Sequence, residues 1–586
     1  MKTDTFQNKV RLIFCFIVFF ALIMVVRLYF LQVVYGQSYA DKADRQYTSV
    51  FVDTYDRGSI FFQNKNKDLI SAASLKTGYI LALNTKIMAT DTEMYYKKIS
   101  AILPMNADTF YSRASKINDP YEEIARQIPK DKISKISELG LPGLIIEKEN
   151  WRYYPGGSLA SNLIGFVGFD DTGNYLEGRY GLEKYYDDNL ERDSRGIYTN
   201  AFAEIFSNIN NNFIQNKNRE ADIITTIDPE VQGYVEKIIA ATNKKWNSET
   251  TGVIVLDPQT GEIYAMATYP TFDANNFKKE TDVGVFGNPL ISNAYEMGSI
   301  IKPLTMAVGL DTEVITADST YNDTGFIKVD GETIHNYDGK ARGVIDMQQV
   351  LNQSLNVGAS YVATKIGKSN FLKYFQAFGI GSETGIDLPN EVAGNIRNLL
   401  NNLNNKKQIE YDTASFGQGI SMTPIITASV LSILANGGKI IIPHVVKEIN
   451  YKIGFSEKVD YTNEAKQVLK NTTSEEITRM LINVVDQSLA DGKRKMENYS
   501  IAAKTGTAQI ARPLSEGGGY YSDKYLHSFF GYFPAYNPRF LVFLYTFKPT
   551  DVTNPLADQY ASQTLTDPFF NITHFLINYY EIPPDR

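Results

Sequence analysis

The stretch 252-GVIVLDPQTGEIYAMATYP-270 decides the fold of the larger part of this chain. Two β-rich runs flank 257-DPQTGE-262, where Pro and Gly supply the dihedral angles of a turn, so the stretch predicts a β-hairpin. Near the other end of the chain, turn residues divide three more runs of this kind: 500-SIAAKTGTAQIA-511, 526-LHSFFGYFPA-535 and 540-FLVFLYTF-547. We therefore expect both ends of this region to meet in one antiparallel sheet.

Helical segments fill the region between these strands. Apolar periodicity predicts helices over 303-PLTMAVGLD-311 and 346-DMQQVLNQSL-355. A third is expected over 424-PIITASVLSILANGG-438, whose two final glycines would form the C-cap. Upstream of the hairpin, Asp228 fits the N-cap of a helix over 229–246, with Pro at its first position. Strands at both ends with helices between them indicate an α+β domain.

The chain of 586 residues is long enough for about two to four domains. Before the α+β domain lies a mixed region with a strand-like piece, 79-YILAL-83, and a helix-like piece, 120-PYEEIARQI-128. The polar stretch 207-SNINNNFIQNKN-218 is typical of a loop or hairpin tip. We expect a domain boundary near Asn218.

An apolar run of membrane-spanning length lies close to the N-terminus. The segment 12-LIFCFIVFFALIMVV-26 is continuously apolar, and 28-LYFLQVV-34 extends it past Arg27. The long side chain of Arg27 can place its charge at the membrane–water interface. Lys and Arg residues precede the run, so the positive-inside rule keeps residues 1–11 in the cytoplasm and sends the chain after the run across the membrane. A cleaved signal peptide and a buried core helix are the alternatives to an uncleaved anchor over 12–34.

The composition is that of a globular protein, with 43% hydrophobic and 21% charged residues, and a net charge of -8 argues against nucleic acid as a partner. Cys15 is the only cysteine, which excludes an intramolecular disulfide and a cysteine-based zinc cluster. The histidines lack the spacing of metal ligands and do not support a Ser-His-Asp triad: His335, His444, His527 and His574. We expect no metal and no cofactor.

Ser299 and Lys302 form the one Ser-x-x-Lys pair of the sequence, within 295-YEMGSIIKPLT-305. Residues three apart are neighbours on a helix surface, so the hydroxyl and the amine could meet. An unassisted serine is a weak nucleophile, and a neighbouring amine that has lost its proton can act as its base. Gly298 and Ser299 would start the helix, where backbone N–H groups and the helix dipole favour a developing anion.

Two later stretches supply further groups that an acyl-transfer site needs. A hydroxyl and an amide come from Ser354 and Asn356 in 353-QSLNVG-358, although these residues could simply form a helix end. An amine, two hydroxyls and a glycine come from 504-KTGT-507, which is expected in a strand. A second Lys-Thr-Gly, 76-KTG-78, is expected to be only a turn.

Residues 504–507 would affect the pKa of Lys302 and would also bind the substrate. Lys504 would help to depress the pKa of Lys302, since a like charge disfavours the protonated form. Gly506 would let a substrate backbone lie close along the strand edge. Thr505 and Thr507 could bind a substrate carboxylate or donate a backbone N–H to an oxyanion.

Ser-x-x-Lys, Ser-x-Asn and Lys-Thr-Gly in this order, the last in a strand, form the motif set of penicillin-binding proteins and serine β-lactamases. The chain resembles a class B penicillin-binding protein, a membrane-anchored peptidoglycan D,D-transpeptidase, over nearly its whole length. Three stretches resemble the non-catalytic pedestal, or dimerisation, domain: 57-RGSI-60, 152-RYYPGGSLASNLIGFVG-168 and 178-GRYGLEKYYDDNL-190. Four resemble the catalytic framework: 225-TTIDPEVQ-232, 253-VIVLDPQTGEIYAMA-267, 378-FGIGSETGIDLPNE-391 and 416-FGQGISMTP-424.

The resemblance implies an α+β architecture in a fixed order along the chain. A cytoplasmic tail over 1–11 and a transmembrane anchor over 12–34 would precede an elongated, mixed pedestal domain over 35–222. A transpeptidase domain over 223–586 would follow, with an antiparallel sheet flanked by helices. This order implies a single-pass protein of the cell (inner) membrane, with its catalytic domain on the outer, periplasmic or extracellular, face.

The resemblance also implies a role for each site residue. Ser299 would be the acylated nucleophile, Lys302 its base and Ser354 a proton relay to the leaving amine. Asn356 would bind the amide of the donor peptide. Binding of the terminal carboxylate is implied for Lys504, Thr505 and Thr507, and the oxyanion hole for the backbone N–H groups of Ser299 and Thr507.

Peptidoglycan stem peptides and β-lactams are the implied ligands. No glycosyltransferase segment is visible, so a membrane polymerase of the SEDS family is the implied partner for glycan synthesis. Two other functions remain open: hydrolysis, as a D,D-carboxypeptidase or β-lactamase, and a catalytically weak scaffold. A division role and an elongation role, the cross-link chemistry and the oligomeric state are also left open.

Overall fold

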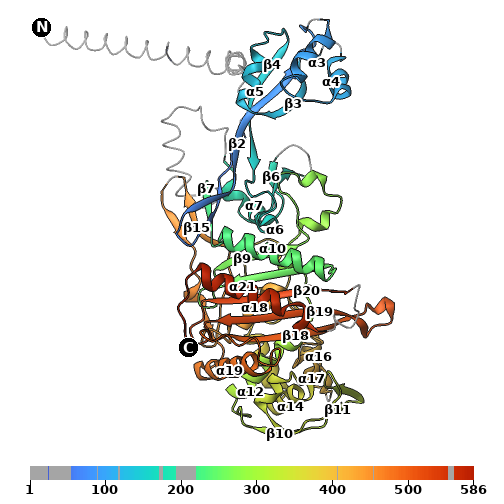
Figure 1. The fold of residues 1–586 in the computed structure, drawn as a ribbon, viewed down its shortest axis with the longest axis vertical. Helices are drawn as coiled ribbons and strands as arrows, with labels where there is room; N and C mark the ends of the chain where they lie inside the picture. Colours follow the sequence, from blue (N-terminus) through green and yellow to red (C-terminus); the bar gives the residue numbers. More distant parts are fainter. Residues whose placement is uncertain are drawn as a thin grey trace, which may run out of the picture. The chain divides into compact units, whose positions relative to one another are not determined.

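The computed structural model describes residues 55–88, 90–116, 119–170, 176–192, 220–405, 407–452, 454–551 and 560–586, together with Met24. Apart from Met24, the predicted tail and anchor lie outside the described residues, as does the predicted loop over 207–218. Within the part that is described, no helix has the length and apolarity needed to cross a membrane. The chain forms two compact units (Figure 1).

A five-stranded antiparallel sheet lies at the centre of the larger unit (Figure 1). Strand β20 pairs with β8, with Phe543 opposite Ile254, so the two ends of this region meet as predicted. The predicted hairpin is confirmed by the pairing of β8 with β9. In sheet order, the strands are β18 (Ala502–Ala511), β19 (Tyr520–Phe533), β20 (Phe540–Phe547), β8 (Thr250–Leu256) and β9 (Ile263–Tyr269). Strand β18 is therefore an edge strand.

One face of this sheet is covered by α10 (Pro229–Lys245) and α21 (Thr566–Tyr579). Successive side chains of a strand point to opposite faces, and Val253 and Val255 of β8 pack in the same buried cluster as residues of these helices. The side chain of Asp228 caps α10 by accepting a hydrogen bond from the N–H of Glu230, which confirms the predicted N-cap.

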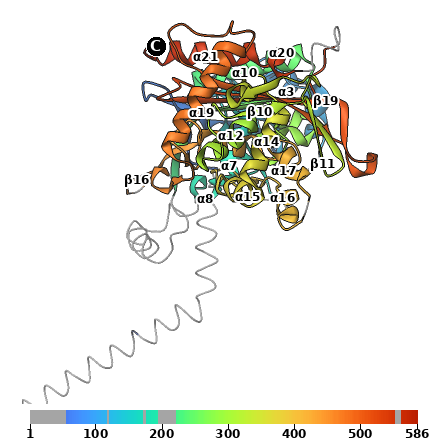
Figure 2. The same ribbon diagram turned by 90° about the horizontal axis from the view of Figure 1, so that it is seen from below.

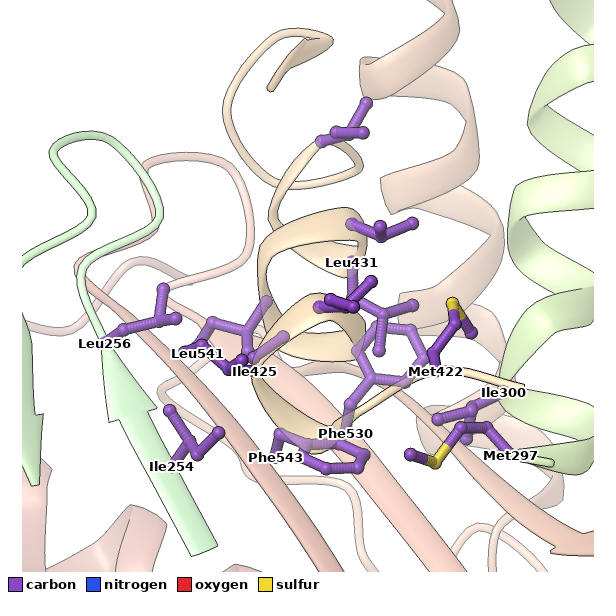
Figure 3. Packing of buried hydrophobic residues seen from close by; sticks show 14 of the residues in the cluster. Ile254, Leu256, Met297, Ile300, Met422, Ile425, Leu431, Phe530, Leu541 and Phe543 are labelled. Carbon is purple, nitrogen blue, oxygen red and sulfur yellow. The ribbon is translucent and has the colours of Figure 1, made fainter. Parts of the chain in front are cut away.

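The opposite face packs against α18 (Pro424–Ser432) and the helices around it. Ile254 and Leu256 of β8 join Ile425 of α18 in the main core cluster (Figure 3). The helix ends at Ser432, before the predicted residue 438, and the chain continues in turns to Gly437 and Gly438. Both glycines have positive φ, as the predicted cap requires, and the N–H of Gly438 donates to the carbonyl of Ile433 at 3.1 Å.

Two of the three sequence motifs lie at the ends of helices below the sheet. A 3₁₀ turn, η5 (Gly298–Ile301), leads into α12 (Lys302–Asp311), which packs against α14 (Asn356–Ile366) (Figure 2). Also packed against α12 are α13 (Met347–Asn352), α15 (Lys368–Ala377) and α19 (Asn471–Asn483). The smaller helices are α11 (Pro289–Ser292), α16 (Arg397–Asn402), α17 (Ile409–Ala414) and α20 (Ala561–Thr564). Short strand pairs are β10 (Thr320–Asp323) with β13 (Gly343–Asp346), β11 (Phe326–Val329) with β12 (Glu332–His335), and β14 (Lys439–Ile440) with β17 (Lys466–Gln467).

A mixed sheet joins early and late parts of the chain within the larger unit. Strand β1 (Ile60–Gln63) runs parallel to β7 (Ala221–Thr225), and β7 runs antiparallel to β15 (Val446–Tyr451), which pairs with β16 (Ser456–Lys458). The other early elements of this unit are α6 (Ser161–Ile164), α7 (Gly181–Tyr185), α8 (Asp187–Leu190), β5 (Val167–Phe169) and β6 (Leu176–Gly178).

A buried ionic cluster holds these early segments. Arg57 Nε donates to one carboxylate oxygen of Glu183 at 2.7 Å, and Arg152 Nε donates to the other at 2.6 Å. Burial opposes ionisation of Glu183, but the two arginines outweigh it and hold the pKa of its carboxyl below the ordinary value. Segments 56–76 and 152–192 thus belong to the same compact unit as the five-stranded sheet.

The smaller unit comprises Tyr55 and residues 77–151 of the described chain. The predicted helix over 120–128 is wrong, because Glu122–Ile128 forms a strand that pairs with Tyr79–Leu83. The predicted turn at 76–78 lies inside a strand, where a Cβ on Gly78 would stand 2.8 Å from the Trp151 ring. Its elements are the ends of β2 (Leu69–Leu83) and β4 (Leu144–Tyr153), with α3 (Thr92–Ser100), α4 (Ala107–Ala114), β3 (Glu122–Ile128) and α5 (Lys130–Ser137).

Candidate active site

Ser299 lies on η5, one turn before α12 begins at Lys302. The expected start of the helix is therefore a 3₁₀ turn, in which side chains three apart eclipse and share one face. Gly298 has a φ of 66°, and a Cβ there would stand 2.6 Å from the carbonyl oxygen of Thr507. Glycine thus lets the turn that carries Ser299 pack directly against β18.

Lys302 is buried, and its Nζ donates to the main-chain oxygen of Ser354 at 2.5 Å and to the Ser354 Oγ at 3.3 Å. Burial, and then the charge of Lys504, hold the pKa of Lys302 well below its ordinary value. A neutral amine has two hydrogens and one lone pair. With both hydrogens directed to Ser354, the lone pair is left to accept a proton.

Ser354 stands in the loop between α13 and α14, where its φ of 54° places it in the left-handed region. Its Oγ also receives a 3.1 Å hydrogen bond from the Nζ of Lys504. Asn356 is the first residue of α14, and its Nδ2 donates to the main-chain oxygen of His335 at 2.9 Å. The structure therefore brings both lysines together at one serine hydroxyl.

The Lys-Thr-Gly-Thr stretch lies in edge strand β18, as the sequence predicts. Burial lowers the pKa of Lys504 to about 8, so this lysine is protonated at neutral pH. Its Nζ also donates to the carbonyl oxygen of Thr505 at 3.0 Å. The Thr507 Oγ1 accepts the N–H of Ala561 at 3.1 Å, which leaves the hydroxyl hydrogen of Thr507 to donate elsewhere.

Gly506 has a packing role that the sequence did not indicate. A Cβ on Gly506 would stand 2.4 Å from the Ser528 Oγ and 2.8 Å from the carbonyl oxygen of Met297. Its missing side chain therefore admits the segment before Ser299, in addition to any substrate at the strand edge. Within the described residues, the Ser299 hydroxyl itself forms no hydrogen bond; catalytic contacts of this kind often tighten only when substrate is bound.

Two residues that sequence reasoning did not single out lie beside this cluster. The Tyr520 hydroxyl donates to the carboxylate of Glu296, with distances of 3.2 and 3.0 Å to its two oxygens. The sequence signal was weak, a lone acidic residue three positions before Ser299.

A half-exposed serine on the same helical face as a buried lysine with a depressed pKa is the arrangement expected of a serine nucleophile that a lysine assists. Residues 251–571 match the model of the penicillin binding protein transpeptidase domain, and residues 55–222 match that of the penicillin-binding protein dimerisation domain. The chain belongs to the penicillin-binding protein transpeptidase family. Its two domains are those of a class B penicillin-binding protein, and its enzyme class is serine-type transpeptidase.

Relatives and solved structures agree with this assignment. The chain is 29% identical to stage V sporulation protein D of Bacillus subtilis, over 92% of this chain and 81% of the relative. It is 25% identical to peptidoglycan D,D-transpeptidase FtsI of Buchnera aphidicola, over 100% and 97% of the two chains. Penicillin binding protein 2X of Streptococcus thermophilus has the same fold, with a TM-score of 0.70 at 18% identity over 90% of this chain and 81% of that chain. Penicillin binding protein 3 of Mycobacterium tuberculosis, complexed with aztreonam, gives a TM-score of 0.66 at 23% identity over 91% and 98%.

Proposed function

We propose that this protein is a membrane-anchored D,D-transpeptidase that cross-links peptidoglycan stem peptides through an acyl-enzyme on Ser299, and that β-lactams inhibit it by forming the same bond. One observation carries the proposal: Lys302, three residues after Ser299, and Lys504 both donate a hydrogen bond to the Ser354 hydroxyl. Lys302, with its depressed pKa, can take a proton, whereas protonated Lys504 can bind a negatively charged group. The name of the Buchnera relative supports the substrate class.

Acylation starts when neutral Lys302 takes the proton of the Ser299 hydroxyl. The Oγ then attacks the carbonyl carbon of the penultimate D-alanine, and the backbone N–H groups of Ser299 and Thr507 stabilise the oxyanion. Two lysines already donate to the Ser354 Oγ, so its own hydrogen is free to pass to the leaving amine. Ser354 regains a proton from Lys302 as the terminal D-alanine leaves.

The donor peptide is held by groups on both sides of the reacting carbonyl. Protonated Lys504 and the hydroxyls of Thr505 and Thr507 bind the terminal carboxylate, and Gly506 keeps the edge of β18 open for the peptide backbone. The Asn356 side chain binds the donor amide once the contact with His335 is released or shared. In the second half-reaction an amine of another stem peptide attacks the ester and restores the Ser299 hydroxyl.

We also propose an order of domains and a membrane topology for the chain. A cytoplasmic tail over 1–11 and an anchor over 12–34 hold a pedestal domain over 35–222 and a transpeptidase domain over 223–586 at the outer face of the cell membrane. Reporter fusions at Lys9 and at the C-terminus test this topology, and a mature protein that begins near Asp41 would contradict it. A SEDS-family glycosyltransferase supplies the glycan strands in this scheme.

The decisive experiment is intact-mass analysis of the full chain after reaction with penicillin. The wild-type protein should gain one penicilloyl group and the Ser299→Ala variant none. Ser292→Ala is the matched control, because Ser292 is also partly exposed on a short helical turn but donates to the carbonyl of Asn288. A covalent adduct on Ser299→Ala protein would refute the proposed nucleophile.

A further inference from the structure

Glu296 is a half-buried carboxylate three residues before the proposed nucleophile, Ser299. Its carboxylate accepts hydrogen bonds from the Tyr520 hydroxyl and from the backbone N–H of Gly419. Within the described residues, no lysine, arginine or histidine forms an ion pair with it. Burial raises the pKa of Glu296 to about 7, so ionisation is unfavourable until a positive charge arrives.

Two other buried carboxylates are compensated by groups of the chain itself. Glu183 is paired with Arg57 and Arg152, and Asp387 accepts the backbone N–H groups of Val445 and Val446, both at 2.8 Å. Glu183 and Asp387 lie outside the three sequence motifs, and their contacts have a structural role. A half-buried carboxylate three residues before the proposed nucleophile, with no ion-pair partner among the described residues, is a functional-site candidate.

The position of Tyr520 shows which part of a bound peptide would reach Glu296. In the pairing of β18 with β19, Thr507 stands opposite His527, and Ala511 stands opposite Tyr520. A donor peptide whose terminal carboxylate sits at Lys504 and Thr507 extends along the edge of β18 toward Ala511. At about 3.4 Å per residue, the residue before the terminal pair lies about 7 Å from the last one, level with Gln509, and Ala511 lies about 7 Å further along the strand. Only a long side chain on that residue would therefore reach toward Tyr520 and Glu296.

We propose that Glu296, held by Tyr520, binds the side-chain ammonium of the residue that precedes the terminal D-alanyl-D-alanine pair of the donor stem peptide. The free side-chain amine of a diamino acid at the third position of the stem peptide is then the group that Glu296 recognises. This inference rests on the proposed function and adds the recognised side chain to it. The Tyr520 and Gly419 contacts orient the carboxylate, and its remaining lone pairs face the ammonium in a charge-assisted hydrogen bond.

Two synthetic pentapeptides ending in D-alanyl-D-alanine provide the test, one with lysine and one with Nε-acetyl-lysine at the third position. The full chain is given each peptide with isotope-labelled D-alanine as acceptor, and exchange of the terminal residue gives KM and kcat. The free amine should lower KM about tenfold or more relative to the acetylated peptide, with a smaller effect on kcat. Equal KM values for the two peptides with wild-type protein would overturn the inference.

Variants connect the preference to Glu296. Glu296→Gln should abolish the preference for the free amine, and Tyr520→Phe should weaken it, because that variant keeps the charge but loses one orienting contact. Glu410→Gln is the matched control, since Glu410 of α17 lies near Gly419 and carries the same charge but does not bond Tyr520. An unchanged preference in Glu296→Gln protein, or the same loss in Glu410→Gln protein, contradicts the assignment.

Two further outcomes separate this inference from the proposed function. A Glu296→Gln protein whose penicilloyl-enzyme lives much longer than that of wild type would make Glu296 the base for water, and would overturn amine binding. A wild-type protein that reacts with penicillin but exchanges neither peptide would contradict transpeptidation. The two peptides are then compared as competitors of penicillin labelling, and equal inhibition by both would overturn the inference as well.

Discussion

Lys302 and Ser354 are joined by a 2.5 Å hydrogen bond from the Nζ of the lysine to the main-chain oxygen of the serine. The left-handed backbone of Ser354 turns this oxygen and the Oγ toward the same amine. This contact fixes the amine at the end of a side chain that would otherwise be free to rotate. Ser354 would therefore position the proposed base, Lys302, in addition to its proposed role as a proton relay.

Replacing Lys302 should therefore remove the base without unfolding the protein. We expect Lys302→Ala to slow acylation by penicillin about 10² to 10⁴-fold. Lys302→Arg should be as slow, because a guanidinium keeps the donors but has no lone pair to offer. Time-resolved labelling with fluorescent penicillin measures the rate, circular dichroism checks the fold, and the exposed Lys493→Ala is the control. Near-normal labelling of Lys302→Arg protein would exclude a lysine base.

The pH dependence of acylation should report Lys504. Burial lowers the pKa of Lys504 to about 8, so this lysine carries its charge below that pH and loses it above. The second-order rate constant for penicillin should thus fall as pH rises through about 8. Lys504→Arg protein keeps its charge and should lose this alkaline limb, even if its rate is lower. Rate constants from pH 5 to 10 test this, and an alkaline limb that persists in the arginine variant would assign it to another group.

Two substitutions of Ser354 separate the effect of its left-handed backbone on stability from the effect of its hydroxyl on acylation. Glycine adopts positive φ without penalty, so Ser354→Gly should be more stable than Ser354→Ala by about 1 kcal/mol. Both variants lack the hydroxyl and should lose acylation to a similar degree. Thermal unfolding compares the stabilities, and penicillin labelling compares the rates. Equal stability of the two variants would show that the backbone relaxes at this position.

Gly506 should not tolerate a side chain. The Cβ of Gly506→Ala would press on the Ser528 Oγ and the Met297 carbonyl, which would displace the turn that carries Ser299. We expect at least about a tenfold slower acylation, since misplacements of about 1 Å can cost 10²-fold. Gly233→Ala in α10 is the control, because its Cβ has only an ordinary 3.7 Å contact and alanine favours a helix by about 1 kcal/mol. A normal rate for Gly506→Ala would refute the packing argument.

The lifetime of the penicilloyl-enzyme should distinguish a cross-linking enzyme from a hydrolase. Water needs a base to attack the ester, and no residue of this chain has been assigned that role. The adduct should persist for many minutes or longer, and an amine acceptor should compete well with water when a stem peptide is the donor. Mass spectrometry over time measures both. Catalytic turnover of penicillin within seconds would move the protein to the hydrolase class.

Part of the fold and part of the candidate site could be predicted from the sequence. The strands of the five-stranded sheet were predictable because their runs are apolar and are divided by turn residues. The segment 120–128 was not, because its apolar spacing fits a helix and only its pairing with distant residue Tyr79 decides for a strand. Glu296 was missed for a similar reason: its partner Tyr520 lies 224 residues away, and only packing brings the two together.

The ionic cluster at Glu183 has a consequence for the modular design of the chain. Arg57 precedes the segment 77–151 in the sequence, and Arg152 follows it immediately. The strands that lead out to this segment and back from it, β2 and β4, pair with each other, so the two ends of the segment are neighbours. In the sequence, the smaller unit is therefore an insertion between two segments that the Glu183 cluster holds together. A short hairpin turn in place of this insertion should leave the cluster intact, so the insertion can be exchanged without disturbing the proposed nucleophile.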